Sequence, residues 1–315
     1  MRELTQVELL QELEPVAESN LNRHLSQARD WHPHDYVPWD DGRNFAAMGG
    51  EDWGPEQSQL SDVAKAAMVL NVLTEDNLPS YHREISEYFD ADGAWRTWVG
   101  RWTAEENRHA IVMRDYLVVT RGVDPVALEN DRMANMTKGV YTDDSSGLLP
   151  GLAYVTIQEL GTRISHRNTG KACDDPVADR MLQRIAADEN LHMIFYRNLC
   201  SAAFDLAPDQ AMEALDDVIE RFQMPGIGMP NFRKMSLTMA KYGIYDLRQH
   251  LDDVLWPVLR KLEIFERTDF TGRGEQARDS LAAWLAKSDE DATRFEEQRD
   301  RLVARDAKRR EKAAS

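Results

Sequence analysis

Two Glu-x-x-His triplets, each preceded by a lone glutamate, constrain the fold of this chain more than any other feature. Glu75 lies 31 residues before the triplet 106–109, and Glu159 lies 30 residues before the triplet 189–192. In a helix, the i, i+3 spacing places both members of a triplet on one face. This doubled order is typical of carboxylate-bridged di-metal centres, in which two helices each supply a glutamate and two supply Glu-x-x-His.

The segments around these residues show the apolar periodicity of buried helix faces. One helix is predicted to start after Ser58 or Ser61 and to run to about 78, and others are predicted over about 94–121, 149–168 and 176–204. Each acidic position interrupts an apolar face. A carboxylate buried there must be paired, protonated or metal-bound, because an isolated buried charge is very costly. One alternative stays open for each position. A single Glu-x-x-His is common in helices, and a lone buried glutamate can be the partner of an arginine or lysine.

The donor types favour iron or manganese over a structural zinc site, which would use cysteine or more histidine. Four carboxylates also balance the charge of two Fe(II) ions, so a buried cluster would be electroneutral. The predicted metal ligands are Glu75, Glu106, His109, Glu159, Glu189 and His192. The sequence therefore predicts a di-iron centre.

The rest of the chain is also predicted to be helical, which gives an all-α fold: a ferritin-like di-iron four-helix core within a larger helical bundle. Pro79 is expected to end the helix from 58, Gly170 to end the helix from 149, and 143–147 to be a loop. The other helices are expected over 3–29, 208–223, 231–264 and after Gly274. We expect 1–298 to be a single domain with its metal-binding core at about 58–205, and the charged tail 299–315 to lack a fixed structure.

Charge and hydropathy limit the function classes. Fifty-five acidic and 38 basic residues give a net charge of −17, which disfavours nucleic acid and anionic membrane surfaces as partners. No apolar run has the length of a membrane span, and the first residues lack the apolar stretch of a signal peptide. Cys173 and Cys200 are too few for a disulfide framework. We therefore expect a cytoplasmic protein without a transmembrane segment.

Longer motifs around the six residues carry a resemblance. They are Leu73-Thr-Glu-Asp-Asn-Leu-Pro-Ser-Tyr81, Arg96-Thr-Trp98, Trp102-Thr-Ala-Glu-Glu-Asn-Arg-His109, Gln158-Glu159 with Ile164-Ser-His166, and Asp188-Glu-Asn-Leu-His192. Together they resemble the soluble acyl-carrier-protein desaturases over about 25–200. Glu-Glu-Asn-Arg-His is quite specific within ferritin-like proteins.

The resemblance implies a role for each ligand and for three further residues. Glu106 and Glu189 would bridge the irons, Glu75 with His109 would complete one site, and Glu159 with His192 would complete the other. Thr162 would lie by the oxygen-binding face, and Trp31 and Asp188 would relay electrons together with an iron-ligating histidine. Gly151 and Leu152 match the region of the family that forms the acyl tunnel.

These further residues also have structural interpretations. Trp31 could be a core or interface aromatic, and Asp188 a residue on the helix surface. The Thr162 hydroxyl could bond a backbone carbonyl in its own helix. Gly151 and Leu152 could serve only in packing between helices.

The reaction implied by the resemblance is O₂-dependent desaturation. Two electrons from ferredoxin and one O₂ would remove two hydrogens from adjacent carbons of a long-chain fatty acyl thioester, leaving a cis double bond and water. The carrier would be acyl carrier protein, and a homodimer is implied. The second family motif usually has a basic pair where this chain has Asn190-Leu191, so acyl-CoA stays open as the carrier.

Two other classes of function share the same cluster. The first is a different di-iron oxygenase, such as a hydroxylase, an N-oxygenase or a radical-generating subunit, which would use Tyr116, Tyr154 or Tyr196. The second is a non-catalytic protein, either a desaturase-like chain that has lost activity or an iron store. Storage fits poorly, because ferritin-type chains are much shorter.

Overall fold

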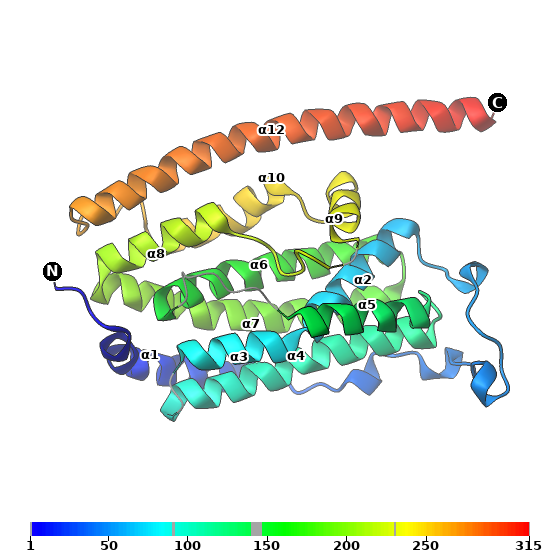
Figure 1. Ribbon diagram of the computed structural model, residues 1–315, viewed down its shortest axis with the longest axis horizontal. Helices are drawn as coiled ribbons and strands as arrows, with labels where there is room; N and C mark the ends of the chain where they lie inside the picture. The colour runs from blue at the N-terminus through cyan, green and yellow to red at the C-terminus, as the bar shows by residue number, and fades with distance from the viewer. Residues whose placement is uncertain (1, 90–91, 140–146, 230, 315) are drawn as a thin grey trace.

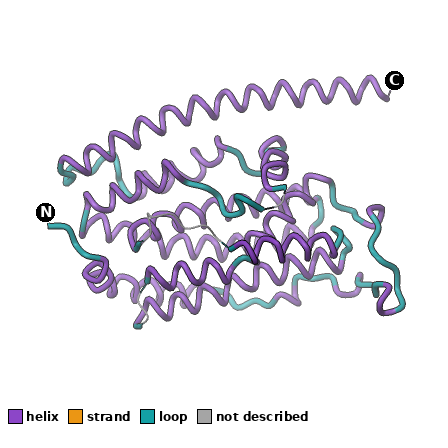
Figure 2. Tube along the Cα trace, viewed as in Figure 1, coloured by secondary structure: helices purple, strands orange, loops and turns teal. Residues whose placement is uncertain are grey.

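Four long helices form the centre of the computed structural model, which describes residues 2–89, 92–139, 147–229 and 231–314 (Figure 1). They are α2 (Asp62–Asp76), α4 (Gly93–Val119), α6 (Leu148–Cys173) and α7 (Pro176–Leu206). Those described ranges contain no β-strand, and Figure 2 shows helices joined by loops. The prediction of an all-α, ferritin-like core within a larger helical bundle is confirmed.

The remaining elements surround this core. They are α1 (Gln6–Gln27), α3 (Leu78–Tyr88), α5 (Pro125–Lys138), α8 (Pro208–Arg221), α9 (Phe232–Lys241), α10 (Leu247–Gln249), the π-helix η5 (His250–Leu255), α11 (Trp256–Lys261), α12 (Gly272–Ala314) and the short 3₁₀ turns η1 (Pro33–Asp35), η2 (Trp39–Asp41), η3 (Ala46–Met48) and η4 (Pro55–Gln57). Figure 1 shows α12 as an outer layer along α8 and α10. The α1 helix packs against α4 and α7.

Capping residues explain where several helices begin. The Ser61 side chain accepts a hydrogen bond from the Ala64 N–H and starts α2. Pro176 occupies the first turn of α7, where its missing N–H costs nothing, and Asp175 caps that turn by accepting from the Val177 N–H. The predicted starts of these two helices are confirmed.

The expectation that Pro79 ends a helix is wrong. The α2 helix ends at Asp76, and Pro79 lies in the first turn of a further helix, α3. Proline is tolerated in a first turn because the N–H it lacks would have no intrahelical partner there. A second helix, α5, was not predicted. The sequence feature that indicates this helix is Asp124-Pro125, since Asp124 caps the helix and Pro125 is its first residue.

Gly170 does not end α6, which runs on to Cys173. An added Cβ at Gly170 would lie 2.8 Å from Asp179 Oδ1 and 3.2 Å from Asp179 Cα, so this glycine allows close packing of α6 on α7. The helix predicted over 231–264 is also broken, into α9, α10, η5 and α11. Gly243 interrupts it with a φ of +72°, a conformation that suits glycine. Most of the loop expected at 143–147 lies outside the described residues.

The tail from residue 299 is helical, contrary to the expectation of an irregular segment, and α12 continues to Ala314. No glycine or proline follows Gly274. Ion pairs one turn apart support the helix, including Arg301 with Glu297 at 3.1 Å. Arg299 also bonds the buried Asp246 at 2.7 Å and so fixes this part of α12 to the start of α10. The extent of the single domain, 1–298, stays a prediction.

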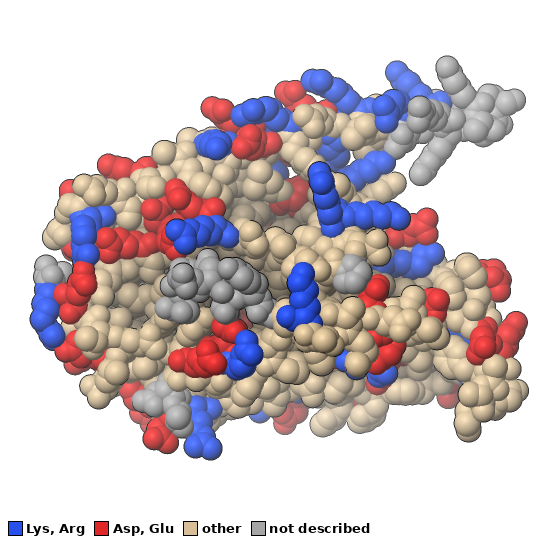
Figure 3. Space-filling model, in the orientation of Figure 1, with Lys and Arg blue, Asp and Glu red and all other residues tan. Residues whose placement is uncertain are grey.

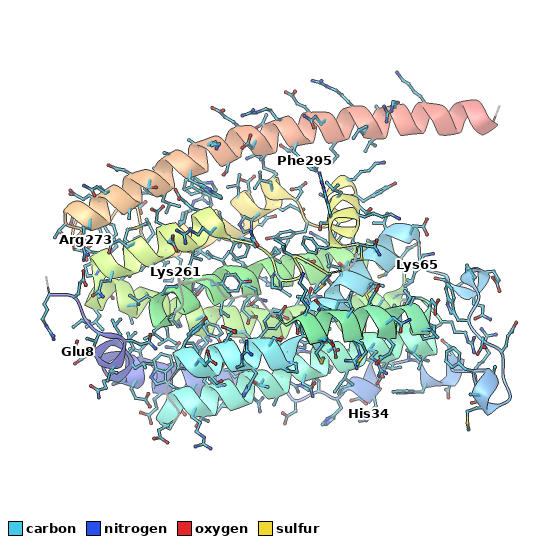
Figure 4. All side chains as sticks on the ribbon, in the orientation of Figure 1. Glu8, His34, Lys65, Lys261, Arg273 and Phe295 are labelled. Carbon is cyan, nitrogen blue, oxygen red and sulfur yellow. The ribbon has the colours of Figure 1, made fainter. Side chains whose placement is uncertain are left out.

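Side-chain pairs fix the first turns of two outer helices. Glu8 forms a capping box with Thr5 in the first turn of α1, and Arg273 at the start of α12 lies 3.6 Å from Glu213 of α8 (Figure 4). Within the described residues, no helix combines the length and the apolar character that crossing a membrane requires.

One buried histidine outside the four core helices makes the stability of the protein depend on pH. His250 in η5 is only 7% exposed, accepts or donates a 2.8 Å hydrogen bond with the Tyr245 hydroxyl, and stacks on Phe222. Burial lowers the pKa of His250 from 6.5 to about 4. The unfolded chain therefore binds this proton more readily than the folded protein. Stability is lost as the pH falls below 6.5, and the loss is complete only below pH 4, where the folded protein also binds the proton.

Between pH 7 and pH 5, protonation of His250 should lower the free energy of unfolding by about 2 kcal/mol. Urea denaturation at both pH values should show a loss smaller by that amount in His250→Gln than in the wild type. The control is His34→Gln, since His34 lies in an exposed turn outside the bundle (Figure 4). An identical loss in His250→Gln and wild type would contradict the prediction.

Candidate metal centre

The six predicted ligands come together at the middle of the four core helices. Each is buried, with at most 6% of its surface exposed. Their oxygen and nitrogen atoms form two overlapping groups within 4.8 Å: Glu75, Glu106, His109 and Glu189, and Glu106, Glu159, Glu189 and His192. The two groups share Glu106 and Glu189. The geometry is thus that of two adjacent sites bridged by two carboxylates.

The atomic contacts follow the same division. His109 Nδ1 lies 3.2 Å from Glu189 Oε1 and 3.3 Å from Glu106 Oε2. His192 Nδ1 lies 2.8 Å from the other Glu106 oxygen, Oε1, and 4.0 Å from Glu189 Oε2. Glu106 and Glu189 therefore each turn one oxygen toward each histidine. Glu75 Oε2 lies 3.7 Å from His109 Nδ1 on the first side.

Several of these buried atoms have no hydrogen-bond partner. Six of them are Glu106 Oε1, Glu159 Oε2, both carboxylate oxygens of Glu189, and Nδ1 of His109 and of His192; the seventh, His109 Nε2, lies 3.5 Å from Asp188 Oδ2. A buried polar atom left without a partner costs about 1–3 kcal/mol, so six in one place need a common explanation. A pair of metal cations supplies it, because each unpartnered atom is a typical donor to iron or manganese. The residues fit the predicted centre.

Electrostatics point the same way. Burial, followed by repulsion from Glu106 and Glu159, raises the pKa of Glu189 well above its ordinary value. A divalent cation between these groups would compete with that proton and would remove the repulsion. The arrangement favours binding of positive charge.

Trp31 and Asp188 meet on the outer side of His109. Asp188 Oδ2 lies 3.5 Å from His109 Nε2 and accepts a 2.7 Å hydrogen bond from the Trp31 indole N–H. The Trp31 ring also stacks on His109, with centroids 6.3 Å apart. Asp188 is 2% exposed, so the alternative of a surface residue does not hold. The structure brings the three together, and their role in electron transfer stays a prediction.

Thr162 is buried near Glu159, but its hydroxyl donates to the Gln158 carbonyl at 2.9 Å and accepts from the Gln158 amide at 3.0 Å. These contacts correspond to the alternative of a hydroxyl bonded within its own helix. Neither of these hydrogen bonds reaches one of the six predicted ligands.

Sequence reasoning missed four residues that hold the ligands. Trp102 donates to Glu159 Oε1 at 2.9 Å, and His166 Nε2 lies 3.0 Å from Glu75 Oε1. Glu105 lies 2.9 Å from His192 Nε2 and 2.9 Å from His24. A signal for Glu105 was present: 101–109 and 184–192 share the pattern Arg-x-x-Ala-acid-Glu-Asn-x-His, in which Glu105 and Asp188 are equivalent.

A cavity of about 930 Å³ reaches the centre from the side of Glu75 and Glu106. Much of its wall is apolar or aromatic, contributed by Leu78, Tyr81, Ile85, Tyr88, Phe89, Trp102, Tyr154, Val155 and Phe222. Gly151 lines this cavity, and its role in an acyl tunnel stays a prediction. Leu152 does not: it is fully buried and lines a separate small void with Cys200 and Ala203. Successive residues of a helix are rotated by about 100° around its axis, so Leu152 lies on a different face of α6 from Gly151.

A family model described as fatty acid desaturase matches residues 5–313. The protein named "Putative acyl-[acyl-carrier-protein] desaturase DesA1" of Mycobacterium tuberculosis is 54% identical over 319 residues, covering 99% of this chain and 94% of that protein. Stearoyl-[acyl-carrier-protein] 9-desaturase 1, chloroplastic, of Oryza sativa is 31% identical over 89% of this chain and 78% of its own.

A solved structure has a similar fold. It is the X-ray structure of "putative acyl-ACP desaturase DesA2" from Mycobacterium tuberculosis, with a TM-score of 0.68 and 32% sequence identity. The match covers 85% of this chain and 98% of the other. The similarity therefore extends over the core helices and well beyond the motifs.

Proposed function

From the premise that this chain belongs to the acyl-[acyl-carrier-protein] desaturase family, we propose that it introduces a cis double bond into a long-chain fatty acyl thioester. O₂ is the co-substrate and ferredoxin the electron donor. The observation that carries the proposal is the cavity, because it joins an apolar wall to two of the clustered carboxylates, Glu75 and Glu106. Its volume lies in the range of ligand pockets.

In this proposal the protein supplies position and exclusion of water. Two iron ions, when bound by the six clustered residues, supply the O₂ reduction and the oxidising power that remove two hydrogens from adjacent carbons. Trp102 holds Glu159, and His166 holds Glu75, so both terminal carboxylates have a fixed orientation. The aromatic wall keeps an extended acyl chain in place beside the centre.

Trp31, Asp188 and His109 form a continuous path of contacts that would bring electrons to the centre. We assign Trp31 as its outer member because its ring borders Arg108 and the turn residue Tyr36, away from the cavity. Thr162 retains the role that family membership implies, by the oxygen-binding face.

The proposed carrier is acyl carrier protein, as in the names of the relatives, and the proposed assembly is a homodimer. The partly buried Asn190-Leu191 replaces the basic pair of the family. Exposed cations do occur elsewhere despite the net charge of −17. Figure 3 shows Lys and Arg atoms near α9 and along α12, with Asp and Glu atoms beside them. Arg233 and Lys234 of α9 are exposed. They offer an acidic carrier local attraction.

The test is iron reconstitution followed by mass analysis of acyl products. Purified protein is loaded anaerobically with Fe(II) and supplied with ferredoxin, its reductase, O₂ and a long-chain acyl carrier protein, with acyl-CoA in parallel. Alkene that depends on iron and on O₂ supports the proposal, and the carrier that turns over identifies the substrate class. Protein that holds two irons but forms no alkene with either thioester would be a desaturase-like chain without activity.

The substitution Gly151→Leu tests the cavity. An added Cβ at Gly151 would lie 3.1 Å from Tyr88 Cδ2, so a leucine must project into the acyl space or displace Tyr88. We expect alkene formation from long chains to fall by at least about tenfold, with two irons still bound, because correct orientation contributes several kcal/mol to catalysis. The matched control is Gly100→Leu on the exposed surface of α4, where an added Cβ meets nothing within 4 Å. Equal activity of the two variants would show that the chain does not pass Gly151.

A radical-generating subunit is the second candidate, and Tyr196 is the observation that favours it. Tyr196 is fully buried, lies one turn beyond His192 on α7, and has a pKa that burial raises well above its ordinary value. Tyr116 is a weaker candidate because its hydroxyl donates to Asp175. A stable tyrosyl radical in the EPR spectrum after oxygenation, absent in Tyr196→Phe, would support this function over desaturation.

A further inference from the structure

The acidic residues before the two bridging glutamates reach across to the opposite helix. Asp188 of α7 contacts His109 of α4, and Glu105 of α4 contacts His192 of α7. Each also pairs with an arginine one turn earlier, Arg184 for Asp188 and Arg101 for Glu105. Each histidine of the centre is therefore supported by a carboxylate from the other helix, and the two carboxylates occupy equivalent positions in their helices.

Glu105 determines which nitrogen of His192 is available to a metal. Its Oε2 lies 2.9 Å from His192 Nε2, and a carboxylate can only accept. Nε2 must then carry the proton, which leaves the lone pair of Nδ1 directed at Glu106 and Glu159. This is the arrangement by which a carboxylate sets the tautomer and orientation of a ligating histidine.

The same oxygen of Glu105 has a second imidazole partner. His24, in the last turn of α1, lies 2.9 Å from Glu105 Oε2 through Nε2 and is 1% exposed. Its ring stacks on His192, with centroids 5.7 Å apart, and meets the edge of Trp98 at 5.0 Å. His24 therefore resembles Trp31: each contacts a supporting carboxylate and stacks on the histidine that this carboxylate supports. For His24 these are Glu105 and His192, and for Trp31 they are Asp188 and His109.

We propose that His24 is a positioning residue, which fixes Glu105 and through it the orientation of His192. The inference rests on the proposed function, since it requires that the clustered residues bind two metal ions. Glu105 belongs to α4 and can rotate about its own side chain. Its other oxygen is held by Arg101 and lies 3.7 Å from Arg108. His24 comes from a different helix, α1, and holds the Oε2 atom of Glu105 in place. Both residues are buried, so a water molecule from the solvent cannot take over the hydrogen bond of His24.

The consequence is an asymmetric effect on metal binding. Loss of His24 should loosen only the site that contains His192 and Glu159, because the site with His109 has its own support from Asp188 and Trp31. Loss of a residue that orients a ligand typically weakens metal binding by about 10–100-fold. A residue with a merely structural role in α1 would weaken both sites alike.

The experiment is anaerobic titration of the full chain with Fe(II) in competition with a colorimetric chelator. The wild type should bind two equivalents tightly. His24→Ala should bind one equivalent as the wild type does and the other about 10–100-fold more weakly. His24→Gln, whose amide can still donate to Glu105, should restore most of the lost affinity. The control His82→Ala removes a partly buried histidine that bonds Thr103, outside the clustered residues, and should match the wild type.

Two results would overturn the inference. One is two equivalents of wild-type affinity in His24→Ala; the other is equal weakening of both equivalents without recovery in His24→Gln. If His24→Ala does not fold, as judged by circular dichroism, Glu105→Gln replaces it and must weaken one equivalent alone. A wild-type protein that binds fewer than two equivalents would overturn the proposed function as well, so the two failures are distinguishable.

Discussion

Glu106→Ala is expected to reduce bound iron from two equivalents per chain to one or fewer and to abolish alkene formation. Glu106 is one of the two carboxylates shared by both groups of clustered residues, so its removal takes an oxygen from each site. Activity should fall by at least about 10³-fold, because a reaction without its metal centre loses the main source of the rate enhancement. Iron is measured by the chelator assay after gel filtration, and alkene by mass analysis.

The loss should not arise from misfolding. Glu106, Glu159 and Glu189 are buried carboxylates that repel one another, so deletion of one relieves repulsion in the apoprotein. We therefore expect Glu106→Ala without iron to keep the far-ultraviolet circular dichroism spectrum of the folded wild-type apoprotein. Retention of two tightly bound irons in this variant would refute the bridged arrangement.

Glu84→Ala is the matched control for iron content. Glu84 is a buried carboxylate on α3 beside the same cavity, but its oxygens bond Tyr88 at 3.0 Å and Arg83 at 3.1 Å rather than the cluster. It should retain two equivalents of iron. Loss of iron in both variants would indicate that iron binding depends on any buried acidic group near the cavity and not on the bridging position of Glu106.

Trp98→Ala should lower the free energy of unfolding by about 3–5 kcal/mol. Trp98 has no exposed surface, stacks on Phe195 with centroids 3.6 Å apart, and meets the edge of Tyr196 at 5.6 Å. Its removal would leave a large void between α4 and α7, which the helices cannot close without moving the ligands. Urea denaturation followed by far-ultraviolet circular dichroism measures the change.

An exposed tryptophan provides the comparison for this loss. Trp39, in a turn outside the bundle, is 50% exposed and donates one hydrogen bond to the His34 carbonyl. Trp39→Ala should cost less than about 1 kcal/mol. A cost for Trp98→Ala as small as that for Trp39→Ala would show that the core around the centre is not closely packed.

The sequence was informative wherever function depends on residues near one another along a helix. The i, i+3 spacing of Glu106 and His109 and its repetition at Glu189 and His192 were enough to predict the metal ligands and the four core helices. Apolar periodicity showed that these positions face inward. The comparison with relatives then confirmed the family.

Helix boundaries were less predictable, because the same residue has different effects in different places. Pro79 begins α3 rather than ending α2, and Gly170 permits close packing rather than ending α6. Local propensity does not distinguish these outcomes, which depend on the neighbour that packs against the residue. The helical tail depended partly on Arg299, whose partner Asp246 caps another helix, α10.

By itself, the sequence determined the fold class, the six clustered residues and the kind of metal they suit, since helical periodicity links each of these to spacing along the chain. Only the tertiary structure decided which side chains hold the ligands in place. His24, Trp102 and His166 act across helix interfaces, and the cavity that excludes Leu152 but includes Gly151 depends on how α3, α6 and α8 pack. The physical reason is that a hydrogen bond between helices depends on their relative rotation and distance, which no local pattern encodes.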